Sequence, residues 1–458
     1  MEVLPNHFVA IIGGAIAGSE AASRLADRGI YTVVFEQNLR PYGKIEDGLP
    51  KWHVKLQDQE EDKIDQKLSK ANVHFVPNTM LGRDIDFDDL VNNWEFSAIL
   101  LANGAWKDRP LPVAGVDEFI DNGLIYQNPL VCWFNHYHES DFNGPKYHLP
   151  DDAIIVGGGL ASLDVVKILM LETVLDKLQE RGVEVDILEL EHQSIASFLE
   201  EQNLTLQDLG LKGCTLYYRR RIKDMPLAQI PPDATPERLE KVYLGREKIL
   251  HNFQNKFLFK FEELRFPTGI ISENGRLLGL KFSETEMIDG NPVVKEGTEY
   301  EVRAPLVISS IGSIPEPVPG IDMNGELYDV VDRETGQLKQ YENVFGLGNV
   351  ITGKGNIKVS LTHGKQVADH VMDNFLAWRE EDYQELIASG EESSKKKVDK
   401  IVELLNEKGF LKVGQVKSIL NQVKRQQKRV GFNGGYSEWM ANHRVERIDA
   451  AIARVKNN

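Results

Sequence analysis

The chain has 458 residues, a formal net charge of −17 at pH 7 and 41% hydrophobic residues. A chain of this length is expected to form about three domains. It contains no run of 18 or more apolar residues, and its apolar stretch near the N-terminus reads as a strand rather than a signal peptide, so we expect a soluble cytoplasmic protein. Only two cysteines occur, Cys132 and Cys214, without a C-x-x-C pair. This excludes a dithiol–disulfide mechanism and a four-cysteine iron–sulfur cluster, and we expect no metal site.

The first motif is the segment VAIIGGAIAGSEAASRLADRG, which begins at Val9. A β-branched run breaks on glycines and opens into an amphipathic helix, an arrangement that aims backbone N–H groups and the positive end of a helix at a pyrophosphate. Ala15 stands where a glycine usually admits the phosphates, whereas Glu36 ends the next strand and can accept bonds from ribose hydroxyls. The alternative is a βαβ unit without a ligand, which Glu36 disfavours. We predict that this turn binds FAD through Gly13, Gly14, Ala15, Ala17, Gly18 and Glu36.

Two later segments fit the same cofactor. Residues 97–115 read as a buried strand that leads into a glycine, and residues 342–371 read as a strand, a glycine-rich turn and a helix. In flavoproteins that bind two dinucleotides, such a returning segment places its helix N-terminus against the flavin. Asn349 stands where an acid is usual and can bond a ribitol hydroxyl as a neutral partner, although a glycine-rich loop before a helix can also be only a loop. The predicted ligands are Gly104, Gly348, Asn349, Gly355, Asn356 and Ile357.

A second glycine turn, AIIVGGGLASLDVVKILM, begins at Ala153 and predicts a nicotinamide-nucleotide site. Its partner strand has two alternatives. Residues 183–191 end in acids, which would repel a 2′-phosphate and favour NADH. Residues 214–226 carry three consecutive arginines, whose planar guanidinium groups match phosphate geometry and favour NADPH, although they could also form a solvated charged turn. We favour the arginines, and the predicted ligands are Gly157, Gly159, Leu160, Ala161, Ser162, Arg219 and Arg220.

On these motifs the chain resembles the adrenodoxin reductase family of NADPH–ferredoxin reductases, and more distantly the small subunit of glutamate synthase. PYGKIEDGLPKWHVK (41–55) is similar to that family's flavin loop, PLVCWFN (129–135) to the segment before its NADP domain, and LVISSIGSIPEPVPG (306–320) to its returning strand. The resemblance covers roughly residues 7–376. It implies FAD and NADPH as cofactors, paired arginines on the 2′-phosphate, and a helical insertion that contains residues 183–191. His53 in the flavin loop could relay a proton to the reduced flavin, whereas a surface histidine without a role is the commoner explanation.

We therefore expect an α/β fold with two Rossmann-like domains. The FAD domain would comprise residues 1–150 and 305–376, the NADPH domain residues 151–304, and a basic helical extension residues 377–458. The predicted function is an FAD-dependent oxidoreductase that takes a hydride from NADPH and passes electrons to a ferredoxin-like carrier. One alternative is an electron-input subunit similar to the glutamate synthase small subunit, and another is a non-catalytic redox sensor or scaffold.

The extension differs from the rest of the chain in charge. From Lys395 to the C-terminus we count fifteen Lys/Arg against six Asp/Glu, so this segment carries +9 and the remainder −26. Residues 379–397 change from acidic to basic, and we interpret them as a linker around Ser389–Ser394. We interpret residues 398–410, 413–429 and about 445–455 as helices. The extension could fold onto the acidic body or dock an acidic electron carrier such as ferredoxin or flavodoxin. Nothing beyond the charge points to nucleic acid, we expect no membrane contact, and a homodimer stays open.

Overall fold

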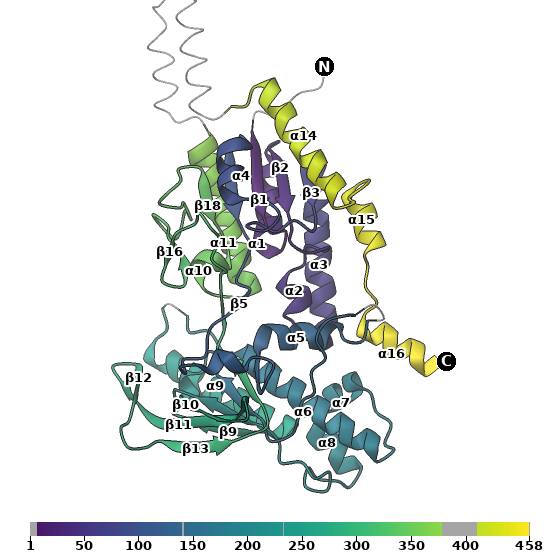
Figure 1. Cartoon of the computed structure of the whole chain (residues 1–458), viewed down its shortest axis with the longest axis vertical. Coiled ribbons are helices and arrows are strands. Elements are labelled where there is room, and N and C mark those ends of the chain that lie inside the picture. Colours follow the sequence, from purple (N-terminus) through teal and green to yellow (C-terminus); the bar gives the residue numbers. More distant parts are fainter. Residues whose placement is uncertain (1–6, 140–141, 232, 378–409, 458) are drawn as a thin grey trace, which may run out of the picture. The chain divides into compact units, whose positions relative to one another are not determined.

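Two parallel β-sheets organise the chain. The computed structural model describes residues 7–139, 142–231, 233–377 and 410–457 (Figure 1). The chain divides into two compact units. Unit 1 comprises residues 1–47, 54–107 and 314–445, and unit 2 comprises residues 48–53, 108–313 and 446–458. Among the described residues, no helix is long and apolar enough to cross a membrane.

Unit 1 is built on a five-stranded parallel sheet with the strand order β18-β4-β1-β2-β3. All five residues of β1 are buried, as expected for a parallel strand that is covered on both faces. Helix α1 packs against α3 and α11, and α14 runs alongside β3 (Figure 1). The strands are β1 (Phe8–Ile12), β2 (Tyr31–Phe35), β3 (Val73–Val76), β4 (Ala98–Leu101) and β18 (Val344–Gly346), with the short hairpin β16 (Met323–Asn324) and β17 (Leu327–Tyr328). The helices are α1 (Ile16–Asp27), α2 (Lys44–Asp47), α3 (Val54–Leu68), α4 (Phe87–Asn93), α10 (Asn349–Thr352), α11 (Ile357–His370), α14 (Val413–Arg429) and α15 (Tyr436–Asn442).

Unit 2 has a second five-stranded parallel sheet, with the strand order β6-β14-β7-β8-β9. It also has an antiparallel sheet, whose strands lie between β9 and β14 in the sequence. Helix α6 is 21 residues long and mostly buried, so it forms the centre of this unit's core. The parallel strands are β6 (Leu124–Tyr126), β7 (Ile154–Gly157), β8 (Thr215–Tyr218), β9 (Lys260–Glu263) and β14 (Val307–Ser310). The antiparallel strands are β10 (Arg265–Glu273), β11 (Arg276–Ile288), β12 (Asn291–Val294) and β13 (Tyr300–Arg303). The helices are α5 (Gln127–His136), α6 (Leu160–Glu180), α7 (Ile187–Gln193), α8 (Ile195–Glu201), α9 (Pro236–Phe257) and α16 (Ile448–Asn457).

The two alternatives for the second strand of the nicotinamide site are distinguished by this topology. β8, which precedes the three arginines, pairs in parallel with β7. Most of residues 183–191 form helix α7 instead, because the side chain of Asp186 caps that helix by accepting the N–H groups of Leu188 and Glu189. The favoured interpretation, with a helical insertion before the arginines, is confirmed.

The boundaries of the two units differ from the predicted domain boundaries at residues 150 and 305. The chain leaves unit 1 at Lys107 and returns at Ile314. Residues 108–150 cluster with unit 2 because β6 pairs with β14 and α5 packs against α6. The described residues of the extension do not form a third unit, since residues 410–445 cluster with unit 1 and residues 446–457 with unit 2.

Two of the three predicted helices of the extension are present, as α14 and α16. The predicted helix at residues 398–410 and the linker lie outside the described residues, apart from Phe410. Helix α14 buries Val416, Ile419 and Val423 in the core cluster of unit 1. The described part of the extension is therefore folded onto the body, one of the two predicted alternatives.

Candidate dinucleotide sites

The first glycine turn requires glycine for steric reasons. Gly13 has a φ of +97°, and a Cβ there would lie 2.6 Å from the carbonyl oxygen of Ala102. A Cβ on Gly18 would overlap the carbonyl oxygen of Gly13. No side chain caps α1, so the N–H groups of its first turn remain available to an anion. The turn therefore has the backbone geometry that a pyrophosphate needs.

Ala15, the departure from the usual glycine, is matched by a glycine in the facing loop. A Cβ on Gly43 would lie 3.0 Å from the Cβ of Ala15, so the alanine methyl group occupies the space that a side chain at residue 43 would need. Gly43 itself has a φ of +53°. The methyl group of Ala15 is thus directed at this loop.

Glu36 lies at the end of β2 and is buried, with 4% of its surface exposed. Its Oε2 accepts the N–H of Gly14 at 2.9 Å and its Oε1 accepts the N–H of Asn38 at 3.0 Å. Burial raises the pKa of this carboxyl group to about 7, although the two backbone N–H groups act in the opposite direction. A ligand hydroxyl that donates to Glu36 would restore part of the solvation that burial removes.

The flavin-side segments meet the first turn at Ala17. A Cβ on Gly348 would lie 3.0 Å from the Cβ of Ala17, and a Cβ on Gly364 would lie 2.8 Å from its carbonyl oxygen. The structure therefore brings together, at the N-terminus of α1, two predicted segments that are more than 300 residues apart in sequence. Gly104 follows β4 with a φ of +72°.

The side chain of Asn349 has a buried polar atom, Oδ1, without a hydrogen-bond partner among the described residues. A Cβ on Gly355 would lie 3.2 Å from its Nδ2, so this glycine is close to the amide. Asn356 caps α11 by accepting the N–H of Val359 at 2.8 Å, and Ile357 begins the helix. The unpaired Oδ1 fits the predicted acceptor of a ribitol hydroxyl.

One residue of this segment could not be found from the sequence. The N–H of Gly348 donates to Nδ1 of His363 at 2.9 Å, and Nε2 of His363 lies 2.7 Å from the carbonyl oxygen of Arg333. Because Nδ1 accepts, the ring proton must be on Nε2. His363 thus holds the turn at Gly348 in place, and a histidine within an amphipathic helix gives no sequence signal for this role.

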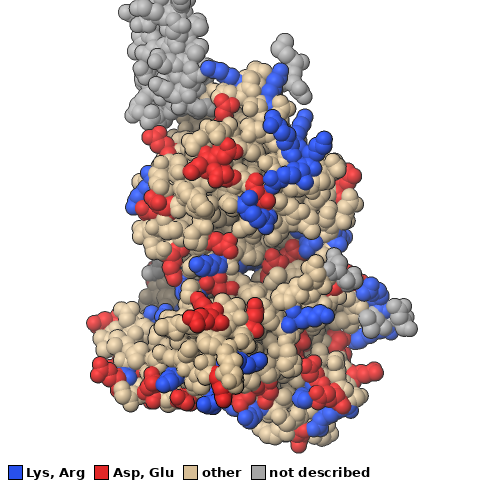
Figure 2. Space-filling view, viewed as in Figure 1, with Lys and Arg blue, Asp and Glu red and all other residues tan. Residues whose placement is uncertain are grey.

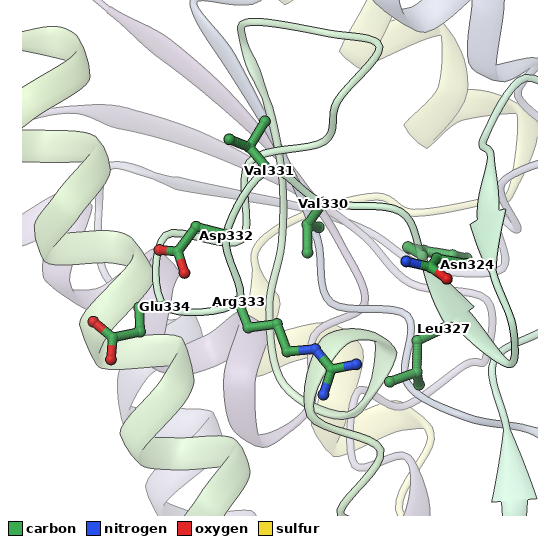
Figure 3. Close-up of a pocket in the computed structure, with 8 residues that line it drawn as sticks. Asn324, Leu327, Val330, Val331, Asp332, Arg333 and Glu334 are labelled. Carbon is green, nitrogen blue, oxygen red and sulfur yellow. The ribbon is translucent and has the colours of Figure 1, made fainter.

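A pocket of about 490 Å³ lies beside this segment, at the β16–β17 hairpin and residues 330–334 (Figure 3). The side chain of Arg333 extends toward Leu327 in Figure 3, whereas Asp332 and Glu334 lie on the other side of the backbone. Tyr328, another lining residue, accepts a bond from Nδ2 of Asn103 at 2.8 Å. The pocket wall is thus connected to the carboxyl end of β4.

The second glycine turn has the same steric requirement. A Cβ on Gly157 would lie 2.5 Å from the carbonyl oxygen of Ser310, and a Cβ on Gly158 would overlap the ring of Tyr218. Gly159 is the N-cap of α6, and the hydroxyl of Ser162 donates to its carbonyl oxygen at 2.7 Å. Leu160 and Ala161 are exposed in the first turn of the helix, where a leucine is accessible to a ligand.

The three arginines follow β8 directly, at the edge of the sheet where β7 leads into this turn. Arg221 is engaged, since its Nε and Nη2 donate to the carboxylate of Asp224 at 2.8 and 3.2 Å. Arg220 donates from Nη1 to the carbonyl oxygen of Gly290 at 3.0 Å. Arg219 is exposed, and no hydrogen bond or ion pair of its side chain occurs within the part of the chain that the structure describes. Arg219 and Arg220, the two predicted phosphate ligands, therefore make fewer hydrogen bonds within the protein than Arg221 does.

His53 ends the 3₁₀ turn Lys51–His53, a segment that clusters with unit 2. Burial, and then the charge of Lys167, lower its pKa, so the ring is neutral at pH 7. In unit 2 its ring lies beside that of Trp52, with centroids 6.0 Å apart. A role in proton transfer to a flavin stays a prediction.

Residues 7–208 match the model of the pyridine nucleotide-disulphide oxidoreductase family. Both cysteines are free thiols, and burial raises the pKa of the Cys214 thiol.

Three proteins of known name are similar to this chain in sequence. The glutamate synthase [NADPH] small chain of Bacillus subtilis is 32% identical over 161 residues, which are 34% of this chain and 31% of that protein. This chain therefore spans only about a third of it. The corresponding Escherichia coli protein is 22% identical over 80% of this chain and 68% of its own. NADPH-ferredoxin reductase FprA of Mycobacterium leprae is 22% identical over 80% of this chain and 84% of its own.

The fold is also that of a solved structure, Mycobacterium tuberculosis FprA in complex with NADPH. The TM-score is 0.62 at 16% sequence identity, over 92% of this chain and all of that one. This structural match confirms the predicted fold class. The predicted resemblance to NADPH–ferredoxin reductases is confirmed by the M. leprae relative and by a probable NADPH:adrenodoxin oxidoreductase of Schizosaccharomyces pombe, which is 24% identical over 70% of this chain and 71% of its own.

Proposed function

We propose that this protein is an FAD-dependent oxidoreductase that takes a hydride from NADPH and passes electrons to a ferredoxin-type carrier. The observation that carries the proposal is the presence of two uncapped glycine turns, each at the start of a helix on its own parallel sheet, one beside Glu36 and the other beside Arg219 and Arg220. Relatives named NADPH-ferredoxin reductase and glutamate synthase [NADPH] small chain support the same class of enzyme.

We assign FAD to the first turn. Backbone N–H groups at the start of α1 would bind the pyrophosphate, since the N–H of Gly14 already donates to Glu36. Glu36 would accept the ribose hydroxyls, and the buried Oδ1 of Asn349 would accept a ribitol hydroxyl. Gly104, Gly348 and the N-terminus of α11 would line the same cofactor. Bound FAD supplies the chemistry of accepting a hydride and releasing electrons.

We assign NADPH to the second turn. The start of α6 would bind the pyrophosphate, and Arg219 and Arg220 would bind the 2′-phosphate by charge-assisted hydrogen bonds. On this assignment unit 1 is the FAD domain and unit 2 the NADPH domain.

For the electron carrier we propose an acidic protein such as a ferredoxin or flavodoxin. Helix α14 contains no acidic residue, and basic side chains gather over it in Figure 2. Five of them are exposed, namely Lys417, Lys424, Arg425, Lys428 and Arg429. A positive face of this kind attracts an acidic carrier at long range. The cytoplasmic location and the homodimer stay predictions.

A second candidate is an electron-input subunit of a larger enzyme, because the glutamate synthase small chains align over most of this chain. The two candidates share FAD and NADPH and differ in the electron acceptor.

The test begins with the purified protein. We expect a yellow protein that releases FAD on denaturation and whose flavin absorbance is bleached by NADPH within one turnover time. Release of FMN or of no flavin would contradict the assignment, and slow bleaching would favour a sensor or scaffold. Reduction of ferredoxin by the purified protein alone would support the carrier, whereas activity only in the presence of a partner subunit would support the second candidate.

A further inference from the structure

The loop at residues 37–43, between β2 and α2, borders the first glycine turn. A Cβ on Gly14 would lie 2.7 Å from the Cβ of Pro41, and Gly43 faces Ala15 as described above. The N–H of Asn38 donates to Glu36. The position of this loop therefore sets the shape of the site on the side of Glu36, where the adenosine ribose would bind.

The C-terminal extension holds this loop directly. The indole N–H of Trp439 donates to the carbonyl oxygen of Leu39 at 2.8 Å, and Nη1 of Arg40 donates to the carbonyl oxygen of His443 at 3.0 Å. Trp439 is only 7% exposed, and its ring is stacked on that of His443 with centroids 3.8 Å apart. Two bonds of opposite direction thus join residues that are about 400 positions apart in the sequence.

A third link passes through Asp65 on α3. The hydroxyl of Tyr42 donates to its carboxylate at 3.1 Å, and the hydroxyl of Tyr436 donates to Oδ1 at 2.6 Å. Burial, and then the charge of Asp65, raise the pKa of both tyrosines, so both remain protonated donors. One carboxylate therefore joins the loop and the extension.

The extension has its own attachment to the sheet. The rings of Phe432 and Tyr436 pack edge-on against Phe75 of β3, and Nε2 of Gln427 donates to the carbonyl oxygen of Phe75 at 2.9 Å. The bond of Gln427 resembles that of Trp439 in type and length. It joins the extension to a strand and not to the loop.

We propose that residues 436–443, which we call the clamp, hold the loop 37–43 in the conformation that retains the adenosine half of FAD. The inference rests on the proposed function, since it takes FAD as the ligand of the first turn. Trp439 is then a positioning residue, and the clamp contributes by preorganising the site before the ligand binds.

The test compares Trp439→Phe, which keeps an aromatic ring but removes the N–H donor, with the matched control Gln427→Ala. FAD release from each holoprotein is followed by the rise in flavin fluorescence, and hydrogen exchange is measured at residues 37–43. For Trp439→Phe we expect FAD release to be faster by roughly two- to tenfold, the range of one net hydrogen bond, and faster exchange in the loop. For Gln427→Ala we expect both quantities to match the wild type, even if the melting temperature falls equally in the two variants.

Two results would overturn the inference: wild-type release and exchange rates in Trp439→Phe, or equal acceleration in Gln427→Ala, which would mean a general loss of stability. A wild-type protein that carries no FAD would instead overturn the proposed function.

Discussion

The choice of coenzyme can be tested at the end of β8. In the double variant Arg219→Ala/Arg220→Ala, the 2′-phosphate of NADPH loses both predicted ligands. A hydrogen bond to a charged group contributes about 1.5–3 kcal/mol. Arg219 has no partner to give up among the described residues, whereas Arg220 would have to give up its bond to the carbonyl oxygen of Gly290, so its net contribution belongs at the lower end.

Because these side chains lie near the solvent, screening also reduces the sum. We therefore expect kcat/KM for NADPH to fall by about tenfold to several-hundredfold, since every 1.4 kcal/mol corresponds to a factor of ten. The value for NADH, which lacks the 2′-phosphate, should change by less than about twofold on the same reasoning.

The assay is the steady-state reduction of ferricyanide with either coenzyme. The matched control is Arg221→Lys, which keeps a cation beside Asp224 and should retain the NADPH preference. A wild-type preference for NADH would refute the assignment, and so would an equal loss with both coenzymes in the double variant. A loss in the control as large as that in the double variant would show that Arg221 is the phosphate ligand.

Three further outcomes are expected. Gly13→Val places a branched side chain against the carbonyl oxygen of Ala102, so the protein should be colourless or unfolded, and a yellow variant with the wild-type FAD content would contradict this. Burial raises the pKa of Glu36 from 4.5 to about 7, so folding disfavours its ionised form, and the FAD-free protein should lose about 3 kcal/mol of stability between these pH values and none above them. FAD would bond the ionised carboxylate, so its affinity for the protein should increase as the pH rises toward 7. In Glu36→Gln, urea unfolding should show no such loss of stability with pH and FAD titration no such gain in affinity. If both pH trends persisted in this variant, the titrating group would be another residue. Lys424→Glu/Lys428→Glu should slow ferredoxin reduction by roughly tenfold at low ionic strength and leave ferricyanide reduction intact, whereas equal effects on both acceptors would remove α14 from carrier docking.

The sequence by itself determined the features whose cause is local. The two glycine turns could be located because a positive φ at Gly13, and the close approach of the Cβ of Ser162 to Gly157, disfavour any side chain at these positions. The apolar face of α14 was also visible, since its spacing follows the period of a helix.

Other features depend on contacts between residues that are far apart in the sequence, and only the tertiary structure decided them. The residues alone allowed 183–191 to be read as a strand, and the pairing of β8 with β7 and the cap of α7 decided that most of them are helical. The bounds of the two compact units differ from the predicted domain boundaries because β6 pairs with a strand about 180 residues away. The role of Trp439 at Leu39 likewise depends on contacts across the whole chain, which no local pattern encodes. Helical periodicity and the backbone conformation of a glycine turn act over a few residues, whereas strand pairing, burial and shared hydrogen bonds exist only once distant segments meet.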